Sequence, residues 1–172
     1  VDFAPVLENN LRFMKACMFN IELKEHGKVI WGDESVLENI PDLKTSDIPR
    51  DDAIRLLFNR IMEQLISLDS FEGGRQSELE FALYQSGKVF TDLASSFLAF
   101  IGKYETTIQK RVKSFKKLIK DYPWISENMP DIVEKVKFWA EFRSKPDLTE
   151  VASRYKKSIE SDVELGKLGF EV

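Results

Sequence analysis

The stretch ELEFALYQSGKVFTDLASSFLAFIGK, Glu78–Lys103, has the longest helical pattern in this chain of 172 residues. The residues that define the pattern are Phe81, Tyr84, Lys88, Leu93, Phe97 and Ile101. Ser77 and Glu80 have the form of a capping box at its start. Gly87, inside the pattern, lowers helix stability by about 1 kcal/mol relative to Ala, so we expect a neighbouring element or a ligand to approach closely there. The stretch predicts one long helix.

Helical patterns also lie on both sides of this stretch. The nearest one upstream ends at Gly73–Gly74. It begins after Ser46 or Asp47, either of which can cap a helix, and Pro49 is tolerated in its first turn. Its apolar stripe consists of Ile54, Leu57, Ile61, Leu65 and Leu68. Further helices are predicted over residues 5–26, 104–120, 132–142 and 148–164. The sequence therefore predicts a mainly α fold, a helical bundle of about five to seven helices.

One short run does not fit a helix. Within KEHGKVIWGDE, Lys24–Glu34, the run Lys28–Trp31 has the pattern of a short strand between Gly27 and Gly32. Gly27 is expected to end the preceding helix in the left-handed conformation. His26, the only histidine, is expected to interact with the exposed carbonyls of that helix end rather than to act in catalysis. Because an isolated strand is not stable, the run predicts a sheet partner, or an edge that pairs with another molecule or folds against the bundle.

The composition and the net charge of the chain limit the classes of function that it can have. The chain is 43% hydrophobic and 31% charged and contains 13 Phe, which favours a globular domain with an aromatic core. A net charge of −4 argues against a bulk attraction to nucleic acid. The single Cys17 excludes an internal disulfide and fits a reducing cytosol, so a cytoplasmic location is expected. No apolar run approaches the ~20 residues of a membrane span, and no signal peptide opens the sequence, so we expect no membrane partner.

Several catalytic and metal-binding patterns are absent from the sequence. It has no HExxH, CxxC, EF-hand, GxSxG, GxGxxG or Walker pattern, and one His with one Cys cannot build a typical zinc site. The pair Asp51–Asp52 is expected to complement the dipole of a helix start. A basic helix carries Lys110, Arg111, Lys113, Lys116, Lys117 and Lys120. Two interpretations of this helix stay open: a solvated face, which we favour, and a patch for a phosphate-bearing ligand.

Lys88 and Tyr84 are the candidate binding residues of the long helix. They are four residues apart and therefore share a helix face, next to Gly87. Such a face can present an ammonium group and a phenol to a triphosphate. The alternative is a lysine whose stem lies along the surface of the bundle, and spacing alone favours this alternative.

Three segments together resemble a known family. They are VDFAPVLENNLRFMKACMFNIELKEHGKVIWGD (residues 1–33), DIPRDDAIRLLFNRI (47–61) and YQSGKVFTDLASSFLAFIGKYETTIQKR (84–111). The first resembles the end of the catalytic domain in minimal nucleotidyltransferases of the DNA polymerase β-like superfamily, with Val1-Asp2-Phe3 as an acidic strand and Gly27–Trp31 as a strand that adds to the sheet. The other two are similar to the helical portion that follows this domain. The resemblance covers most of residues 1–120.

The resemblance implies two domains with different roles. Residues 1–34 would be a strand–helix–strand remnant of the catalytic domain, and residues 35–172 a helical domain that binds substrate. Asp2 matches the third catalytic carboxylate, which with two others binds divalent cations for transfer of a nucleotide from NTP to an acceptor hydroxyl. The chain lacks the Gly-Ser and Asp-x-Asp elements that supply the other two. We therefore expect Mg²⁺ and NTP to act in the intact protein, and neither a cofactor nor catalysis in this chain alone. Lys88, and less directly Tyr84, would contact the substrate, because the resemblance places their helix beside the cleft.

Other interpretations stay open. The chain could instead be a non-catalytic helical module that binds a protein partner or a second copy of itself. An RNA-processing helical domain is disfavoured, because Arg12 and His26 do not match its R-x4–6-H element. The abrupt apolar start fits a piece of a longer protein. The expected partners are a nucleotide, an acceptor that the sequence does not identify, and a homodimer mate.

Overall fold

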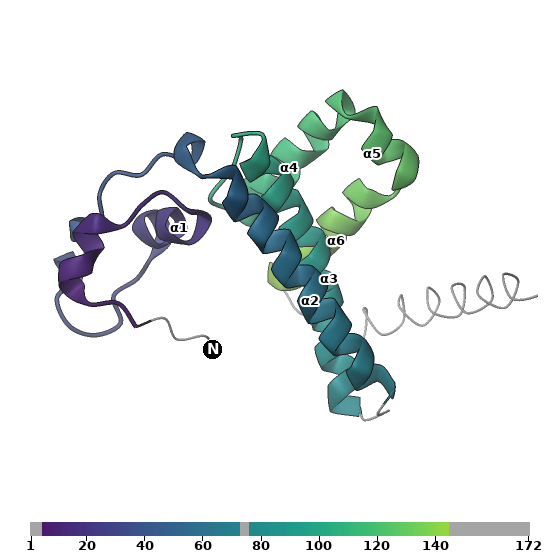
Figure 1. Cartoon of the computed structure of the whole chain (residues 1–172), viewed down its shortest axis with the longest axis horizontal. Coiled ribbons are helices and arrows are strands. Elements are labelled where there is room, and N and C mark those ends of the chain that lie inside the picture. Colours follow the sequence, from purple (N-terminus) through teal and green to yellow (C-terminus); the bar gives the residue numbers. More distant parts are fainter. Residues whose placement is uncertain (1–4, 73–75, 145–172) are drawn as a thin grey trace, which may run out of the picture. The chain divides into compact units, whose positions relative to one another are not determined.

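The computed structural model describes residues 5–72 and 76–144 of the chain. Within these ranges every regular element is a helix, so the predicted mainly α fold is confirmed (Figure 1). The chain divides into two units, Val1–Ala140 and Glu141–Val172, and the contacts given below lie within the first. Asp2 and the helix predicted over 148–164 lie outside the described residues.

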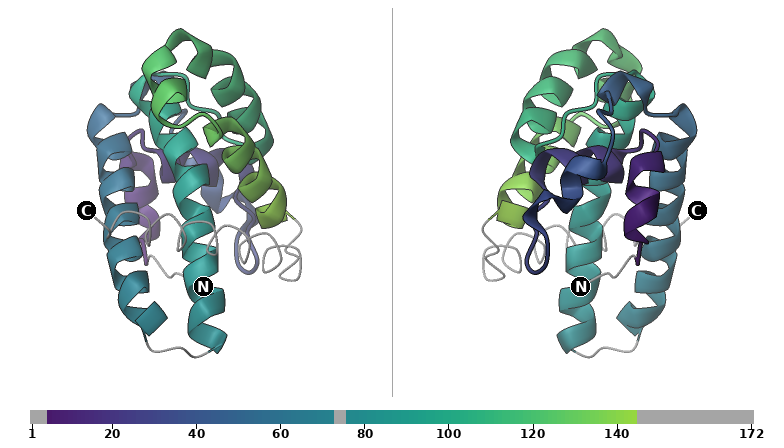
Figure 2. Two further views of the ribbon diagram at one scale, coloured as in Figure 1. Left: turned by 90° about the vertical axis from the view of Figure 1, so that its right-hand side faces the viewer. Right: turned by 90° about the vertical axis from the view of Figure 1, so that its left-hand side faces the viewer.

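The described helices follow one another without an intervening strand. The α-helices are α1 (Met18–His26), α2 (Arg50–Glu72), α3 (Gln76–Phe100), α4 (Ile108–Leu118), α5 (Pro123–Asn128) and α6 (Ile132–Ser144). The short 3-10 helices are η1 (Glu8–Phe13), η2 (Glu34–Asn39), η3 (Thr45–Asp47) and η4 (Ile119–Asp121). The two longest, α2 and α3, lie side by side (Figure 2). None of the helices in these ranges is long and apolar enough to cross a membrane.

Helix α3 packs its apolar face against the helices that follow it. The buried residues of this main core are Ala94, Leu98, Phe115, Ile119, Ile125, Ile132 and Val136. The ring of Phe97 meets the rings of Phe115 and Tyr122 edge to face, with centroid separations of 5.6 and 5.0 Å. Such aromatic pairs add to the stabilisation that burial alone provides. The aromatic core expected from the phenylalanine content is therefore present between α3, α4 and the short helices after it.

The other face of α3 is polar, and α2 packs on it. Ser96 Oγ donates a hydrogen bond of 2.6 Å to the carbonyl of Ala53. Further along the pair, Arg60 Nε lies 3.2 Å from Asp92 Oδ2. Because the residue number rises along α2 as it falls along α3, the two helices run antiparallel. Helix α3 thus separates an apolar core on one side from a polar helix interface on the other.

Gly87 allows α6 to approach α3 closely. A Cβ atom built on Gly87 would lie 2.2 Å from Cε3 of Trp139, which is far inside the contact distance of two carbon atoms. Trp139 is only 3% exposed. The close approach predicted at Gly87 is made by a neighbouring helix.

The single helix predicted over residues 5–26 is wrong. The segment forms η1 and then α1, and the backbone between them is extended at Met14 and at Cys17. Asp52 Oδ2 accepts a hydrogen bond of 3.1 Å from the backbone N–H of Met18, and Cys17 Sγ accepts one of 3.3 Å from that of Asn20. These acceptors satisfy the first N–H groups of a helix. A carboxylate distant in sequence therefore helps to define where α1 begins.

The strand predicted between Gly27 and Gly32 is also wrong. These residues form an irregular loop, and the side chains of Ile30 and Trp31 are 97% and 94% exposed. No strand in the described ranges is available to pair with the loop, and a lone strand is not stable. Gly32 has a φ of 103°. Gly27 ends the helix with a φ of −59°, not in the left-handed region, and a Cβ there would lie 2.3 Å from the Leu23 carbonyl oxygen.

A second, smaller core joins the N-terminal segment to α2 and α3. Its buried residues are Ile21, Ile48, Ala53, Ala99 and Tyr104. Since Ile21 precedes residue 34 and the others follow it, residues on both sides of the predicted domain boundary share this core.

Candidate functional site

Lys88 and Tyr84 are the two predicted substrate-binding residues that the structure describes. Lys88 Nζ lies 5.6 Å from the centroid of the Tyr84 ring, so the two side chains share a face of α3. Tyr84 is 46% exposed, and the Lys88 side chain is 22% exposed. The structure therefore brings these two residues together at a partly accessible position. Asp2, predicted as a catalytic and metal-binding residue, lies outside the described residues.

Lys88 belongs to an ionic cluster between α2 and α3. This α2–α3 cluster consists of Arg60, Glu63, Lys88 and Asp92. Lys88 Nζ lies 3.5 Å from Glu63 Oε2, and the same oxygen accepts a short hydrogen bond from Arg60 Nη1. The other side of Arg60 faces Asp92. The four side chains are only 13–30% exposed. Arg60 thus pairs with a carboxylate on each side.

Among the described residues, the α2–α3 cluster pairs two cations with two carboxylates. Removing one partner of such a partly buried pair leaves a charge without compensation, which is costly. A phosphate group that approaches Lys88 must therefore compete with Glu63. The arrangement explains how α2 is attached to α3, and it makes Glu63 a competitor for any anion that binds Lys88.

A second polar cluster links α1, α3 and α4 around Tyr104. Arg111 Nη1 lies 2.9 Å from Glu22 Oε1 and donates a hydrogen bond of 2.6 Å to the Tyr104 hydroxyl. Arg111 also donates a longer bond, 3.3 Å, to Ser95 Oγ. The Tyr104 hydroxyl donates to Glu22. Burial raises the pKa of Tyr104 above its ordinary value. The buried phenol therefore stays protonated as a hydrogen-bond donor.

Arg111 was counted with the lysines of the basic helix, for which a solvated face was favoured, and for Arg111 this prediction is wrong. The lysines of the helix are exposed, as a solvated face requires, and they are Lys110, Lys113, Lys116 and Lys117. The Arg111 side chain is only 16% exposed and turns inward. One signal of this orientation is present in the sequence, because Arg111 precedes the buried Phe115 by four residues and therefore shares its face.

His26 contacts a threonine and a glutamate at the end of α1. Its Nε2 lies 3.1 Å from Thr106 Oγ1, and the Thr106 hydroxyl donates a hydrogen bond of 2.6 Å to Glu25 Oε2. A hydroxyl has one proton to donate, so His26 Nε2 must be the donor toward Thr106. In that state the imidazole cannot take the threonine proton as a general base. The trio ties α1 to the loop before α4 and does not form a nucleophile.

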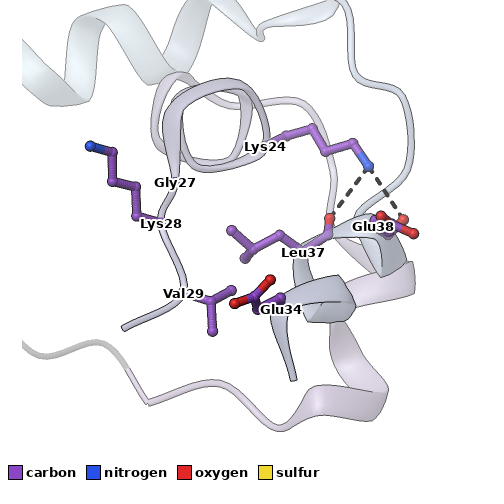
Figure 3. Close-up of a pocket in the computed structure, with 7 residues that line it drawn as sticks. All are labelled: Lys24, Gly27, Lys28, Val29, Glu34, Leu37 and Glu38. Carbon is purple, nitrogen blue, oxygen red and sulfur yellow. Dashed lines mark hydrogen bonds between the residues drawn. The ribbon is translucent and has the colours of Figure 1, made fainter. Parts of the chain in front are cut away.

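An open pocket lies beside the loop that follows α1 (Figure 3). Its volume is about 550 Å³, and its lining residues are Lys24, Gly27, Lys28, Val29, Glu34, Leu37 and Glu38. Lys24 Nζ donates hydrogen bonds of 3.3 Å to the carbonyls of Leu37 and Glu38. These bonds hold η2 against the end of α1. With two lysines and two glutamates in its lining, the pocket favours neither an anion nor a cation.

Helix α2 carries an exposed apolar face, which we call the outer face of α2. Its residues are Ile54, Phe58, Ile61, Met62, Leu65 and Ile66. The least exposed of them, Met62, is 45% exposed and the most exposed, Ile66, is 62% exposed. Of the apolar stripe that the sequence predicted, Ile54, Ile61 and Leu65 belong to this outer face, and the sequence did not predict that they are exposed. The pairing of Arg60 and Glu63 in the α2–α3 cluster, together with the burial of Ala53, fixes which side of α2 packs against α3.

The described residues do not form a metal site. In the ranges 5–72 and 76–144, no three His, Cys, Asp or Glu side chains come together in a way that could hold a metal ion. No family model matches the sequence, and no curated protein or solved structure matches it either.

Proposed function

We propose that this chain is a binding module that docks on a partner through the outer face of α2. The observation that supports this proposal is the arrangement of α2, which pairs Arg60 and Glu63 toward α3 and exposes the six large apolar side chains of its outer face. Exposed apolar patches of this size are characteristic of interaction sites. A helix that lays such a face into an apolar groove is a common mode of protein recognition.

A partner that covers the outer face of α2 gains free energy from the burial of its apolar side chains. Fully burying one large aliphatic or aromatic side chain contributes about 1.5–3 kcal/mol. The six side chains of the face are about half exposed, so a partner that covers them gains a large part of this free energy. The interior of the chain does not use it, because α2 is attached to α3 through the ionic cluster and the Ser96 hydrogen bond.

Site-specific photo-crosslinking in cells tests this proposal. A photoreactive phenylalanine analogue replaces Ile61 at the centre of the outer face, and the control replaces Lys116, which is exposed on α4. We expect a defined crosslinked product from position 61 and none from position 116. The absence of any product at position 61, with the protein present and folded, would contradict a docking role for this face.

A second candidate is the helical, nucleotide-binding part of a nucleotidyltransferase-like protein that transfers NMP from NTP to an acceptor hydroxyl, with Mg²⁺ bound elsewhere in the intact protein. Two observations favour it. Lys88 and Tyr84 lie together at a partly accessible position on α3. The segment that resembles the end of a catalytic domain also exposes large apolar side chains: Val6, Leu7, Phe13, Phe19, Ile30 and Trp31. Such a segment is suited to pack against a further folded body.

Titration calorimetry with MgATP on the whole protein tests the second candidate. We expect heat of binding from the unsubstituted protein and a loss of affinity of at least about tenfold for Lys88→Ala, because a charge-assisted contact to phosphate contributes roughly 1.5–3 kcal/mol. Lys116→Ala, an exposed lysine outside the cluster, is the control and should bind normally. If the unsubstituted protein shows no binding, this candidate is wrong. If Lys88→Ala binds equally well, only the assignment of Lys88 is wrong. A cytoplasmic location is part of both proposals, since a lone cysteine fits a reducing compartment.

A further inference from the structure

We propose that the occupant of the outer face of α2 is a second copy of this chain, packed antiparallel about a two-fold axis near residue 60. The inference rests on the proposed docking function, because it names the partner of that same face. It is supported by the order of the residues on the face, by the area they offer, and by the position of Arg55, which is exposed beside them.

The residues of the face are arranged almost symmetrically about position 60. Ile54 and Ile66 lie six positions on either side of it, and Phe58 and Met62 lie two positions on either side. In an antiparallel pair with this axis, Ile54 of one copy is opposite Ile66 of the other, and Phe58 is opposite Met62. Each of these four positions then meets an apolar partner, whereas Ile61 and Leu65 lie opposite Asn59 and Arg55. A two-fold interface requires this kind of self-complementary surface.

The face is also large enough for self-association. From Ile54 to Ile66 the helix rises about 18 Å, at about 1.5 Å per residue. A half-exposed side chain of this size leaves roughly 100 Å² in contact with solvent, so the six residues offer on the order of 600 Å² per copy before their neighbours are counted, compared with about 800 Å² in a standard interface. The face alone supplies most of the area that a specific dimer needs.

Charge favours the antiparallel over the parallel arrangement. Arg55 is exposed at the edge of the face. In a parallel pair the two copies of Arg55 lie at the same level, where like charges repel. With the axis near residue 60, Arg55 of one copy lies at the level of Leu65 of the other. Antiparallel packing also brings the opposite ends of the two helix dipoles together, which is favourable.

Analytical ultracentrifugation of the whole chain tests the dimer. We expect a two-fold increase in mass with rising concentration, complete at about 100 µM or below, which is the range of a weak to moderate interface. Ile61→Glu places a charge at the centre of the face and should weaken the dimer by at least about tenfold. The control, Trp124→Glu, places a charge at a large side chain of α5 that is 60% exposed outside the face, and should leave association unchanged.

Circular dichroism and urea unfolding show whether Ile61→Glu still folds. Because Ile61 is 58% exposed in the single chain, the monomer should keep its helix content. A protein that stays monomeric across the concentration series overturns the proposal. A dimer that Ile61→Glu does not weaken overturns it as well.

Disulfide trapping tests the orientation. Cys17 is first replaced by Ser, which retains the ability to accept the hydrogen bond from Asn20. Two single-cysteine variants, Phe58→Cys and Met62→Cys, are then oxidised alone and as a mixture. We expect a crosslinked product from the mixture and little from either variant alone. Efficient crosslinking of Phe58→Cys with itself indicates a parallel pair and contradicts the proposed axis.

These results separate failure of the dimer from failure of the docking function. A monomeric protein whose position 61 crosslinks to a different protein in cells overturns the second-copy proposal and leaves the docking function standing. A monomer that crosslinks to nothing at this position contradicts both.

Discussion

At the scale of single residues, Gly87 and Trp139 show how a missing Cβ sets the distance between two helices. The indole of Trp139 occupies the space that a side chain at Gly87 would need, and this packing buries the indole almost completely. Glycine is unfavourable inside a helix by about 1 kcal/mol. The packing of a large aromatic side chain against α3 offsets this cost.

We predict that Gly87→Ala destabilises the protein by about 2–3 kcal/mol, because the overpacking cost exceeds the gain in helix propensity. The free energy of unfolding in urea is the measurement. In a Trp139→Ala background the same substitution should cost much less, because the clash is absent. An equal loss in both backgrounds would show that the indole is not what excludes a side chain at Gly87.

Tyr104 is the second residue whose surroundings determine its chemistry. Burial raises its pKa above the ordinary value near 10, whereas in the unfolded chain the phenol ionises at about that pH. The folded state therefore retains a proton that the unfolded state releases. By linkage, the free energy of unfolding is unaffected by Tyr104 below about pH 10 and falls as pH rises above it.

We predict that Tyr104→Phe removes this alkaline loss. The variant should be about 1–2 kcal/mol less stable at pH 7, because the hydrogen bonds to Glu22 and Arg111 are lost. The difference between the two proteins should shrink between about pH 10 and pH 11, because only the unsubstituted protein keeps a buried phenol. Urea midpoints measured from pH 8 to pH 11 test this. A difference in urea midpoint that stays constant from pH 8 to pH 11 would contradict the assignment of the alkaline loss of stability to Tyr104.

At the scale of elements, α2 is attached to α3 by polar groups and turns its apolar side away. Most amphipathic helices pack the opposite way. The ionic contacts of Arg60 with Glu63 and Asp92, together with the Ser96 hydrogen bond, explain how the charged side can be buried. A buried charge is stable only beside its own counter-charge, so such pairs favour one arrangement of the two helices. The α2–α3 pair should therefore be sensitive to the loss of a single carboxylate.

We predict that Asp92→Asn costs about 2–3 kcal/mol, because it leaves the Arg60 guanidinium with less compensation in a position that is only 13% exposed. The control is Asp131→Asn. Asp131 pairs with Lys135 at 2.9 Å, but these side chains are 59% and 48% exposed, so the loss should be below about 0.5 kcal/mol. Urea unfolding of both variants gives the comparison. Similar losses would mean that burial does not distinguish the two pairs.

At the scale of the whole molecule, apolar side chains divide into those that hold the fold together and those that are available for partners. Phe115 belongs to the first group and is 1% exposed. Ile30 and Trp31, at the tip of the loop after α1, belong to the second group with the outer face of α2. The polar clusters around Tyr104 and Thr106 connect α1 to the bundle without using these exposed residues.

We predict that the double substitution Ile30→Ser and Trp31→Ser changes the free energy of unfolding by less than about 0.5 kcal/mol, because exposed surface positions rarely matter for stability. Phe115→Ala should cost about 3–5 kcal/mol, because it leaves a cavity in the main core. Both values come from urea unfolding of the whole chain. A large loss in the double variant would show that the loop packs against the protein after all.

The helical pattern of the sequence is sufficient to identify most of the bundle. The spacing of Phe97 and Ile101 and the pattern from Ile132 onward predict α3 and α6, because local periodicity determines which residues can share a face. The i, i+4 spacing of Tyr84 and Lys88 likewise predicts that their side chains meet. Local rules are enough for such features, since the interacting groups are one helical turn apart.

Contacts between residues distant in sequence determine the features of the fold that local patterns do not predict. The start of α1 depends on Asp52, and the indole of Trp139 fills the space beside Gly87. Within residues 5–72 and 76–144, no strand pairs with the loop that carries Ile30. The outward orientation of the apolar stripe of α2 follows from the pairing of Arg60 with Asp92, 32 positions away. The sequence by itself determined which residues form helices and where their apolar residues lie. Only the tertiary structure decided which face of each helix is buried, because that choice depends on charge partners and on space that neighbouring helices supply.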